Sequence, residues 1–489
     1  MASPFIVNGL GAPQYGLLST VGVTLSFFGV LDLGIGAAAT RQIAACASAG
    51  DRPGVDATIN NSIAFYLAIG VVGGLAIAVC ANLIVTRVLT VPAALQRTGR
   101  YALYLSALGF PLTLVSGALA AVPRAIQRFD IAARISIALT TLSTGLILAL
   151  VLSGRGLLAI LAVGLALAAA GLLVNALVAR SLLPGLRVRP ELDRAVLRRL
   201  FRFGAFFFLS TLAVTLLYQL DKLLVGSILG MAAVTFYVVP GNLTQRIQGF
   251  VGAAVSVVFP VSAALFETRN PEAVRRLYIE GTRFMFILIT SLAVPLAVFA
   301  HPFLRHWIGE PVAGQSWIPM MLLAGTYGFL GMTGVAWSIA NGAGEARYNF
   351  AFTLGIAVVD IGLLLVLIHP FGVTGVAAAY LASAALGAPL LVSYIERRVI
   401  GLSGTQFLRI FWRIGVAGLG QALLGLALRP LGVNLPATLA LMALSALSFF
   451  ALYWVFGFVR EEDRSLISLL TQRLRSGGAA VQPDQESPH

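Results

Sequence analysis

The sequence predicts an all-α protein, a polytopic bundle of membrane-spanning helices. Of the 489 residues, 58% are hydrophobic and only 11% are charged, and the mean hydropathy is +0.92. A soluble domain would carry roughly a quarter charged residues. Apolar runs of about 18 residues or more recur along the whole chain, and each can cross ~30 Å of hydrocarbon as a helix. The runs are continuous rather than alternating, which excludes a transmembrane barrel.

Thirteen of these runs are long enough to be full spans, and a basic connector divides them into two groups. The first group contains Gln14–Thr40, Ile59–Val85, Tyr101–Val122, Ile131–Leu152 and Leu157–Ala179. The second contains Gly204–Leu229, Val234–Leu265, Phe284–His306, Ile318–Ile339, Phe350–Ile368 and Val373–Tyr394, followed by Ile410–Leu428 and Pro436–Phe458.

The grouping predicts an order of domains along the chain. We expect an N-terminal transmembrane lobe (1–180), a basic cytoplasmic linker (181–203), a C-terminal lobe (204–398), two additional helices (399–460) and a cytoplasmic, partly disordered tail (461–489).

The arginines predict the orientation in the membrane. If the loop between Thr40 and Ile59 is cytoplasmic, every second loop joins it, and that side collects the arginine cluster from Arg180 to Arg202. The opposite side keeps only Arg87, Arg97, Arg100, Arg155, Arg305 and Arg429. This asymmetry places the C-terminus in the cytoplasm. The net charge of +14 therefore reflects orientation signals, and no soluble basic face exists to bind nucleic acid.

The chain also repeats itself. Leu10–Gly16 resembles Leu229–Tyr237, and Gln127–Asp130 resembles Ala346–Asn349, at an offset of about 220 residues in both places. Both matches open a span on the same side of the membrane, so the repeat is parallel and predicts duplicated six-helix lobes. The counterpart of Gly204–Leu229 would precede Met1, so we expect most of an original first helix to be truncated.

Several short motifs, in order along the chain, resemble one family. They are Leu10-Gly-Ala-Pro-Gln-Tyr-Gly16, Leu31-Asp-Leu-Gly-Ile-Gly36 followed by Arg41, Ile126-Gln-Arg-Phe-Asp130, Gln219-Leu-Asp-Lys-Leu-Leu224 and Gly344-Glu-Ala-Arg-Tyr-Asn349. Their order and spacing are similar to bacterial polysaccharide-biosynthesis (O-antigen) flippases of the multidrug/oligosaccharidyl-lipid/polysaccharide exporter superfamily.

The resemblance implies a bacterial inner-membrane flippase. It implies two lobes that form a V around a central cavity, and alternating access that moves a lipid-linked oligosaccharide or exopolysaccharide precursor to the outer leaflet. Its partners would be a polyprenyl-pyrophosphate-linked glycan and membrane lipid, with a polysaccharide polymerase as a further partner to consider, and the chain itself would be a monomer. A cation-coupled multidrug exporter and a peptidoglycan-precursor flippase of the same superfamily are the alternatives.

Ionisable residues inside the spans are the candidate binding residues, because a charge at bilayer depth is costly. Arg246 lies near the middle of its span in an unusually polar stretch. We expect Arg246 to meet the anionic head group in the cavity, although a structural pair with a buried acid such as Asp221 is the alternative. The other candidate substrate-binding residues are Asn242, Gln245, Gln248 and Lys222.

A second set of candidate residues, most of them acidic, is expected to act in ion coupling or gating. Asp221 and Asp360 lie within spans and could pair with a cation or carry a proton or sodium ion. Asp32 and Arg41 belong to the family motif, and a gate or helix-packing role is favoured there. We find no motif for catalysis or nucleotide binding, and no ligand-like spacing of His or Cys, so the sequence predicts a non-enzyme without cofactor or metal.

Overall fold

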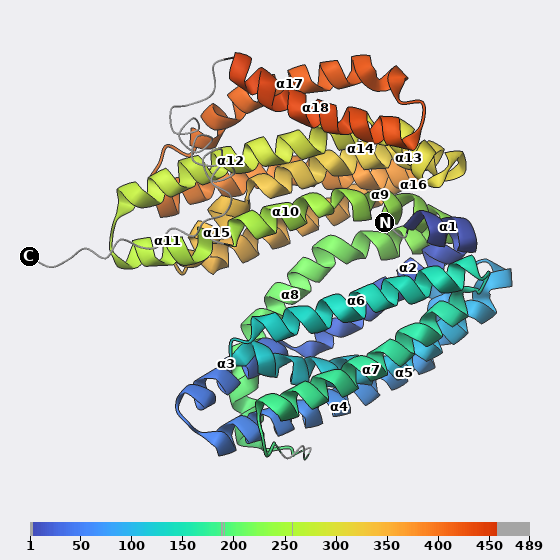
Figure 1. The fold of residues 1–489 in the computed structure, drawn as a ribbon, viewed down its shortest axis with the longest axis vertical. Helices are drawn as coiled ribbons and strands as arrows, with labels where there is room; N and C mark the ends of the chain where they lie inside the picture. The colour runs from blue at the N-terminus through green and yellow to red at the C-terminus, as the bar shows by residue number, and fades with distance from the viewer. Residues whose placement is uncertain (1–2, 187–188, 190, 257, 457–489) are drawn as a thin grey trace, which may run out of the picture.

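The computed structural model describes residues 3–186, 189, 191–256 and 258–456. Helices α1–α7 form one group, α9–α18 form a second, and α8 crosses between them (Figure 1). The first group contains α1 (Ser3–Leu10), α2 (Ala12–Gly29), α3 (Ile35–Ser48), α4 (Arg52–Leu83), α5 (Ala93–Ala125), α6 (Phe129–Leu152) and α7 (Leu157–Leu182), and α8 is Arg194–Ile228. The second contains α9 (Met231–Thr244), α10 (Arg246–Val255), α11 (Val258–Glu267), α12 (Pro271–Val298), α13 (Ala300–Ile308), α14 (Glu310–Met332), α15 (Gly334–Gly342), α16 (Ala346–Ile395), α17 (Gln406–Leu428) and α18 (Leu435–Val455).

The prediction of an all-α polytopic bundle is confirmed. In the described part of the chain, 12 helical segments are long and apolar enough to cross a membrane. One of them contains two of the predicted spans, because α16 reverses at Gly372, whose φ of 54° and ψ of −136° are not helical. Residues on either side of this turn then face each other, as the rings of Tyr348 and Tyr394 do, with centroids 4.9 Å apart. The 13 predicted spans are therefore all represented.

Two predicted spans end earlier than expected. Gln14–Thr40 is not one helix, because Leu33 (φ 52°) and Gly34 (φ 73°) adopt left-handed conformations that separate α2 from α3. Asp32 stabilises this break, since its Oδ1 accepts the backbone N–H of Gly36 at 3.3 Å in the first turn of α3. Phe284–His306 ends at Val298, and the polar residues that follow belong to the short helix α13.

Two other spans are interrupted. Val234–Leu265 breaks at Gln245 and again after Val255. Thr244 precedes the first break, and its hydroxyl donates to the carbonyl oxygens of Pro240 (2.9 Å) and Gly241 (3.2 Å). A hydroxyl that bonds to a carbonyl one turn earlier often bends the helix. Ile318–Ile339 is divided into α14 and α15 at Thr333.

The basic segment before the second lobe is held against the first. The backbone N–H groups of Arg189 and Asp193 donate to the side chains of Asn60 (3.1 Å) and Asn61 (2.6 Å) in α4. Asp193 caps α8, which begins at Arg194, within the range 181–203 expected as a linker. The expected tail, 461–489, lies outside the described residues.

Backbone geometry supports the internal repeat. Gly11 and Gly230 precede α2 and α9 in nearly the same conformation, with φ of 78° and 89°. Gln127 (φ 62°) and Gly344 (φ 80°) likewise hold positive φ shortly before α6 and α16. Turns of the same kind thus recur at the sites that the sequence matches indicate.

The two groups touch where α2 passes α9. A Cβ added to Gly16 would lie only 1.7 Å from the carbonyl oxygen of Met231, so the two backbones are in direct contact. The hydroxyl of Thr235 donates to the carbonyl oxygen of Ala12 at 2.6 Å in the same region. The helices diverge from this end of the molecule towards the other (Figure 1).

Candidate functional site

Arg246 begins α10 and is exposed. Met231 and Thr235, earlier on the same segment, contact α2 of the first lobe. Asn242 follows Thr235 by two helical turns, is exposed, and interacts with Tyr15 of α2. Arg246 is four residues after Asn242, on the other side of the break at Gln245. Asn242 is thus next to the first lobe, and Arg246 is the exposed residue that begins the following helix.

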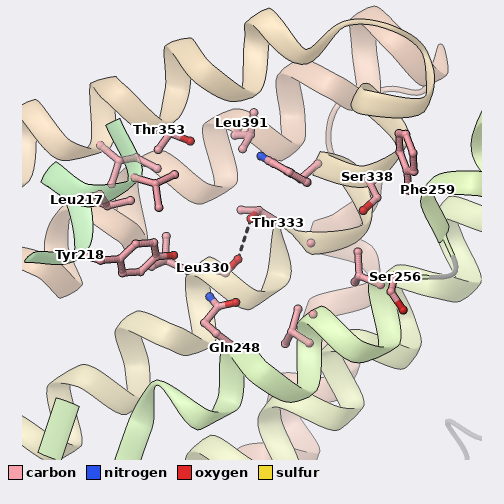
Figure 2. Close-up of a pocket in the computed structure, with 17 residues that line it drawn as sticks. Leu217, Tyr218, Gln248, Ser256, Phe259, Leu330, Thr333, Ser338, Thr353 and Leu391 are labelled. Atoms are coloured by element: carbon pink, nitrogen blue, oxygen red, sulfur yellow. Dashed lines mark hydrogen bonds between the residues drawn. The ribbon is translucent and has the colours of Figure 1, made fainter. Parts of the chain in front are cut away.

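Gln248 lines a partly open pocket of about 490 Å³, and Arg246 is not among its lining residues (Figure 2). The lining comes from α8, α10, α11, α14, α15 and α16. The wall is mainly apolar, with Tyr218, Thr333 and Ser338 among its polar members. The Thr333 hydroxyl donates to the Leu330 carbonyl oxygen at 2.7 Å, so this donor is used within its own helix.

The predicted substrate-binding residues thus do not converge on one cavity. Among them only Gln248 lines the pocket of Figure 2, whereas Arg246 and Asn242 are exposed and Gln245 is half-buried. Lys222, on α8, donates from Nζ to Oε1 of Gln219 at 2.9 Å. The linear sequence did not indicate that Gln248 lines this partly open apolar pocket while the other four candidates lie outside it.

Asp221 is buried inside the second lobe, with 5% of its surface exposed. Its Oδ2 accepts the hydroxyl of Tyr237 at 2.5 Å, and its Oδ1 accepts the backbone N–H of Lys222 at 2.8 Å. The alternative that Asp221 pairs with Arg246 is wrong, because Tyr237 occupies the carboxylate and Arg246 is exposed.

Asp360 lies on α16 and interacts electrostatically with Asp221. It is 3% exposed, and its Oδ1 has no hydrogen-bond partner among the described residues. A buried carboxylate oxygen without a partner is costly unless a proton or a cation meets it. The geometry therefore suits a carboxyl pair that exchanges a small cation.

Tyrosines surround this pair, and the sequence reasoning did not identify them. Tyr237 bonds to Asp221, while Tyr327 and Tyr380 pack with ring centroids 6.2 Å apart and interact electrostatically with Tyr218 and Asp221. The Tyr380 hydroxyl also lacks a partner within the described chain. The sequence feature that could have identified these tyrosines is the presence of phenol groups inside otherwise apolar runs. In the described residues, no group of three or more His, Cys, Asp or Glu side chains gathers as a metal site would.

Asp32 lies at the first lobe's break between α2 and α3, and Arg41 lies two turns into α3. Asp32 accepts hydrogen bonds from the Tyr66 hydroxyl and from the backbone of Gly36, so it fastens the start of α3 to α4. Arg41 is exposed on α3. These contacts support the helix-packing interpretation of Asp32.

Known proteins share both sequence and fold with this chain. A family model described as polysaccharide biosynthesis protein matches residues 13–321. The membrane protein EpsK of Bacillus subtilis (strain 168) is 24% identical over 311 residues, which cover 63% of this chain and 61% of EpsK, so the match spans less than two thirds of that relative.

Two solved structures share the fold. The lipid II flippase MurJ in an inward closed conformation aligns with a TM-score of 0.72 at 12% identity, covering 95% of this chain and 97% of MurJ. An inward-facing multidrug resistance MATE family transporter of the MOP superfamily aligns with a TM-score of 0.67 at 17% identity, covering 81% and 94%.

Proposed function

The chain belongs to the polysaccharide biosynthesis protein family, and we propose that it is a flippase that moves a lipid-linked oligosaccharide or exopolysaccharide precursor from the inner to the outer leaflet of the bacterial inner membrane. The membrane-spanning helices and the transporter folds it resembles support a translocation function over an enzymatic one. Alternating access of the two lobes is the proposed mechanism.

The exposed guanidinium of Arg246 is the observation that carries this proposal. A pyrophosphate must cross a low-dielectric layer in which each bare charge costs several kcal/mol. An exposed cation offsets that cost while the isoprenoid tail of the carrier stays in lipid. Asn242, four residues before Arg246, adds an amide suited to sugar hydroxyls.

The buried carboxyl groups support coupling to a cation gradient. Asp221 and Asp360 lie inside the second lobe, away from the exposed face that carries Arg246. We propose that they take up a proton or a sodium ion during the cycle, that Asp32 stabilises the first lobe's break as it moves, and that Arg41, exposed on α3, acts in gating. The same carboxyl pair favours the second candidate function, a cation-coupled multidrug exporter.

The test is substitution of Arg246 in a cell that depends on this chain for surface polysaccharide. Arg246→Ala should lower surface polysaccharide at least about tenfold, and Arg246→Lys should retain part of it, because a point charge remains but the bidentate fork is lost. Lipid-linked precursor should accumulate on the cytoplasmic side.

Arg155→Ala is the matched control, since Arg155 is an exposed arginine in the turn between α6 and α7. It should leave polysaccharide unchanged. Normal surface polysaccharide with Arg246→Ala, at wild-type protein level in the membrane, would exclude Arg246 from translocation. Unchanged polysaccharide together with increased drug sensitivity would favour the exporter.

A further inference from the structure

A second, strongly basic pocket lies at the edge of the second lobe, outside the surfaces described above. Helices α17 and α18 pack beside α12 at this edge (Figure 1). Between them is a pocket of about 200 Å³. We call it the basic pocket, and its lining residues are Arg283, Gln406, Arg409, Ile410, Arg413, Ile414 and Tyr453.

The pocket has the chemistry of an anion site. Its lining contains three arginines and, among the described residues, no acidic side chain. Gln406 adds an amide that can donate hydrogen bonds. Guanidinium groups hold phosphate oxygens through planar, paired hydrogen bonds, so clustered arginines select phosphate over a small monovalent anion.

Arg283 distinguishes this pocket from ordinary orientation arginines. A residue that only marks the cytoplasmic side would lie in water, whereas Arg283 is 7% exposed. Its Nη2 donates to Oε2 of Glu280 at 2.7 Å, one turn earlier on α12, which holds the guanidinium in place at the wall of the pocket. Arg409 and Arg413 are one turn apart on α17 and are both exposed, and the Arg413 guanidinium lies over the Trp412 ring, 5.9 Å from its centroid.

The surroundings place the pocket at the boundary between polar and apolar membrane regions. Arg283 directly precedes the apolar part of α12, which begins at Phe284. Trp412 and Trp454 flank the pocket on α17 and α18 and are 54% and 65% exposed. Exposed tryptophans gather at the level of lipid head groups. Leu408, also exposed, offers apolar surface beside them.

We propose that the basic pocket binds the phosphate group of an anionic phospholipid, with its acyl chains lying along the exposed apolar faces of α17 and α18. A basic pocket between membrane helices at head-group depth is suited to such a lipid. The exposed aromatic and aliphatic side chains around it favour a lipid over a soluble phosphate. The bound lipid would fasten α17 and α18 to α12.

The proposal is tested with the purified full-length chain in phosphatidylcholine nanodiscs titrated with phosphatidylglycerol. Phosphatidylglycerol should raise the thermal unfolding midpoint. The variant Arg409→Gln/Arg413→Gln should weaken the apparent affinity about tenfold or more, because two charge-assisted contacts are lost. Arg409→Lys/Arg413→Lys should give an intermediate affinity, since the charges remain without the planar fork.

The matched control is Arg124→Gln/Arg134→Gln, which removes two exposed arginines from the first lobe and should bind phosphatidylglycerol like the wild type. Inorganic phosphate is added in a parallel titration without phosphatidylglycerol. Wild-type affinity in Arg409→Gln/Arg413→Gln would overturn the site. A midpoint increase with inorganic phosphate equal to that with phosphatidylglycerol would overturn the lipid assignment.

Discussion

Asp360 carries the clearest functional signal among single residues. It is buried, it has an unpartnered oxygen in the described chain, and it interacts electrostatically with Asp221. Asp360→Asn removes the ionisable group while keeping its shape. We therefore expect polysaccharide export to fall several-fold, whereas the thermal unfolding midpoint should stay at or above the wild-type value, as happens when a strained functional group is neutralised. Export is measured in cells and the midpoint on purified protein.

Asp130→Asn is the control for this prediction, because Asp130 is an exposed carboxylate paired with Arg128 at 2.9 Å. Asp130→Asn should change polysaccharide export and the thermal unfolding midpoint only slightly, because an exposed ion pair contributes little to stability. Wild-type export by Asp360→Asn across a range of pH and sodium concentration would contradict a coupling role for the carboxyl pair.

The sequence alone shows which ionisable residues lie inside apolar runs, but it does not show which side chains they contact in the folded protein. Arg246, Asp221 and Asp360 could be found because charge inside an apolar run is rare. The partner of Asp221 could not be found, since Tyr237 belongs to the next helix and is one of 12 tyrosines in the chain. The basic pocket was missed for the same reason, because Arg283 and Arg409 come from helices far apart in the sequence.

At the scale of elements, the contact between α2 and α9 depends on the missing side chain of Gly16. Gly16→Ala would place a Cβ 1.7 Å from the Met231 carbonyl oxygen, a backbone atom that cannot rotate away. The helices must then separate, which we expect to cost about 1–3 kcal/mol in the free energy of unfolding. Unfolding of the purified variant in denaturant measures this loss.

Gly22→Ala is the control on the same helix, because its new Cβ would meet nothing within 4 Å. There the alanine should be neutral or stabilising, since it lowers the entropy of the unfolded chain. Equal stability of the two variants would show that the close approach of α2 and α9 contributes little.

Hydropathy predicted where helices occur better than where they break. The turn at Gly372 was anticipated as a boundary, because His369 and Pro370 interrupt the apolar run. The break at Leu33 and Gly34 was not, since a single acidic residue, Asp32, between two apolar runs does not interrupt the hydropathy of the span. Apolar content indicates whether a segment lies in lipid or in water. It does not indicate where a residue adopts a positive φ and breaks the helix.

At the scale of the molecule, the lobes meet at one end and diverge towards the other (Figure 1). A disulfide across the contact should therefore restrict their relative motion. We expect oxidised Ala12→Cys/Thr235→Cys, in a background without Cys46 and Cys80, to lose export and to regain it on reduction, because Thr235 already reaches the backbone of Ala12 at 2.6 Å. Export is compared before and after reductant.

A cross-link inside one lobe is the control. Gly425 on α17 lies beside Ser445 on α18, where an added Cβ would lie 3.3 Å from Ser445 Oγ. Gly425→Cys/Ser445→Cys should therefore oxidise without loss of export. Full export by the oxidised inter-lobe variant would mean that transport needs no change in this contact.

Helix α8 is anchored in both lobes. Near its start the Phe201 ring packs on Phe65 of α4, with centroids 5.1 Å apart, and towards its end Asp221 holds Tyr237 of α9. Its 35 residues contain no proline. Each end of α8 is therefore fixed to a different lobe. If the lobes move relative to each other, α8 must bend, and its curvature would then differ between the states of the proposed transport cycle.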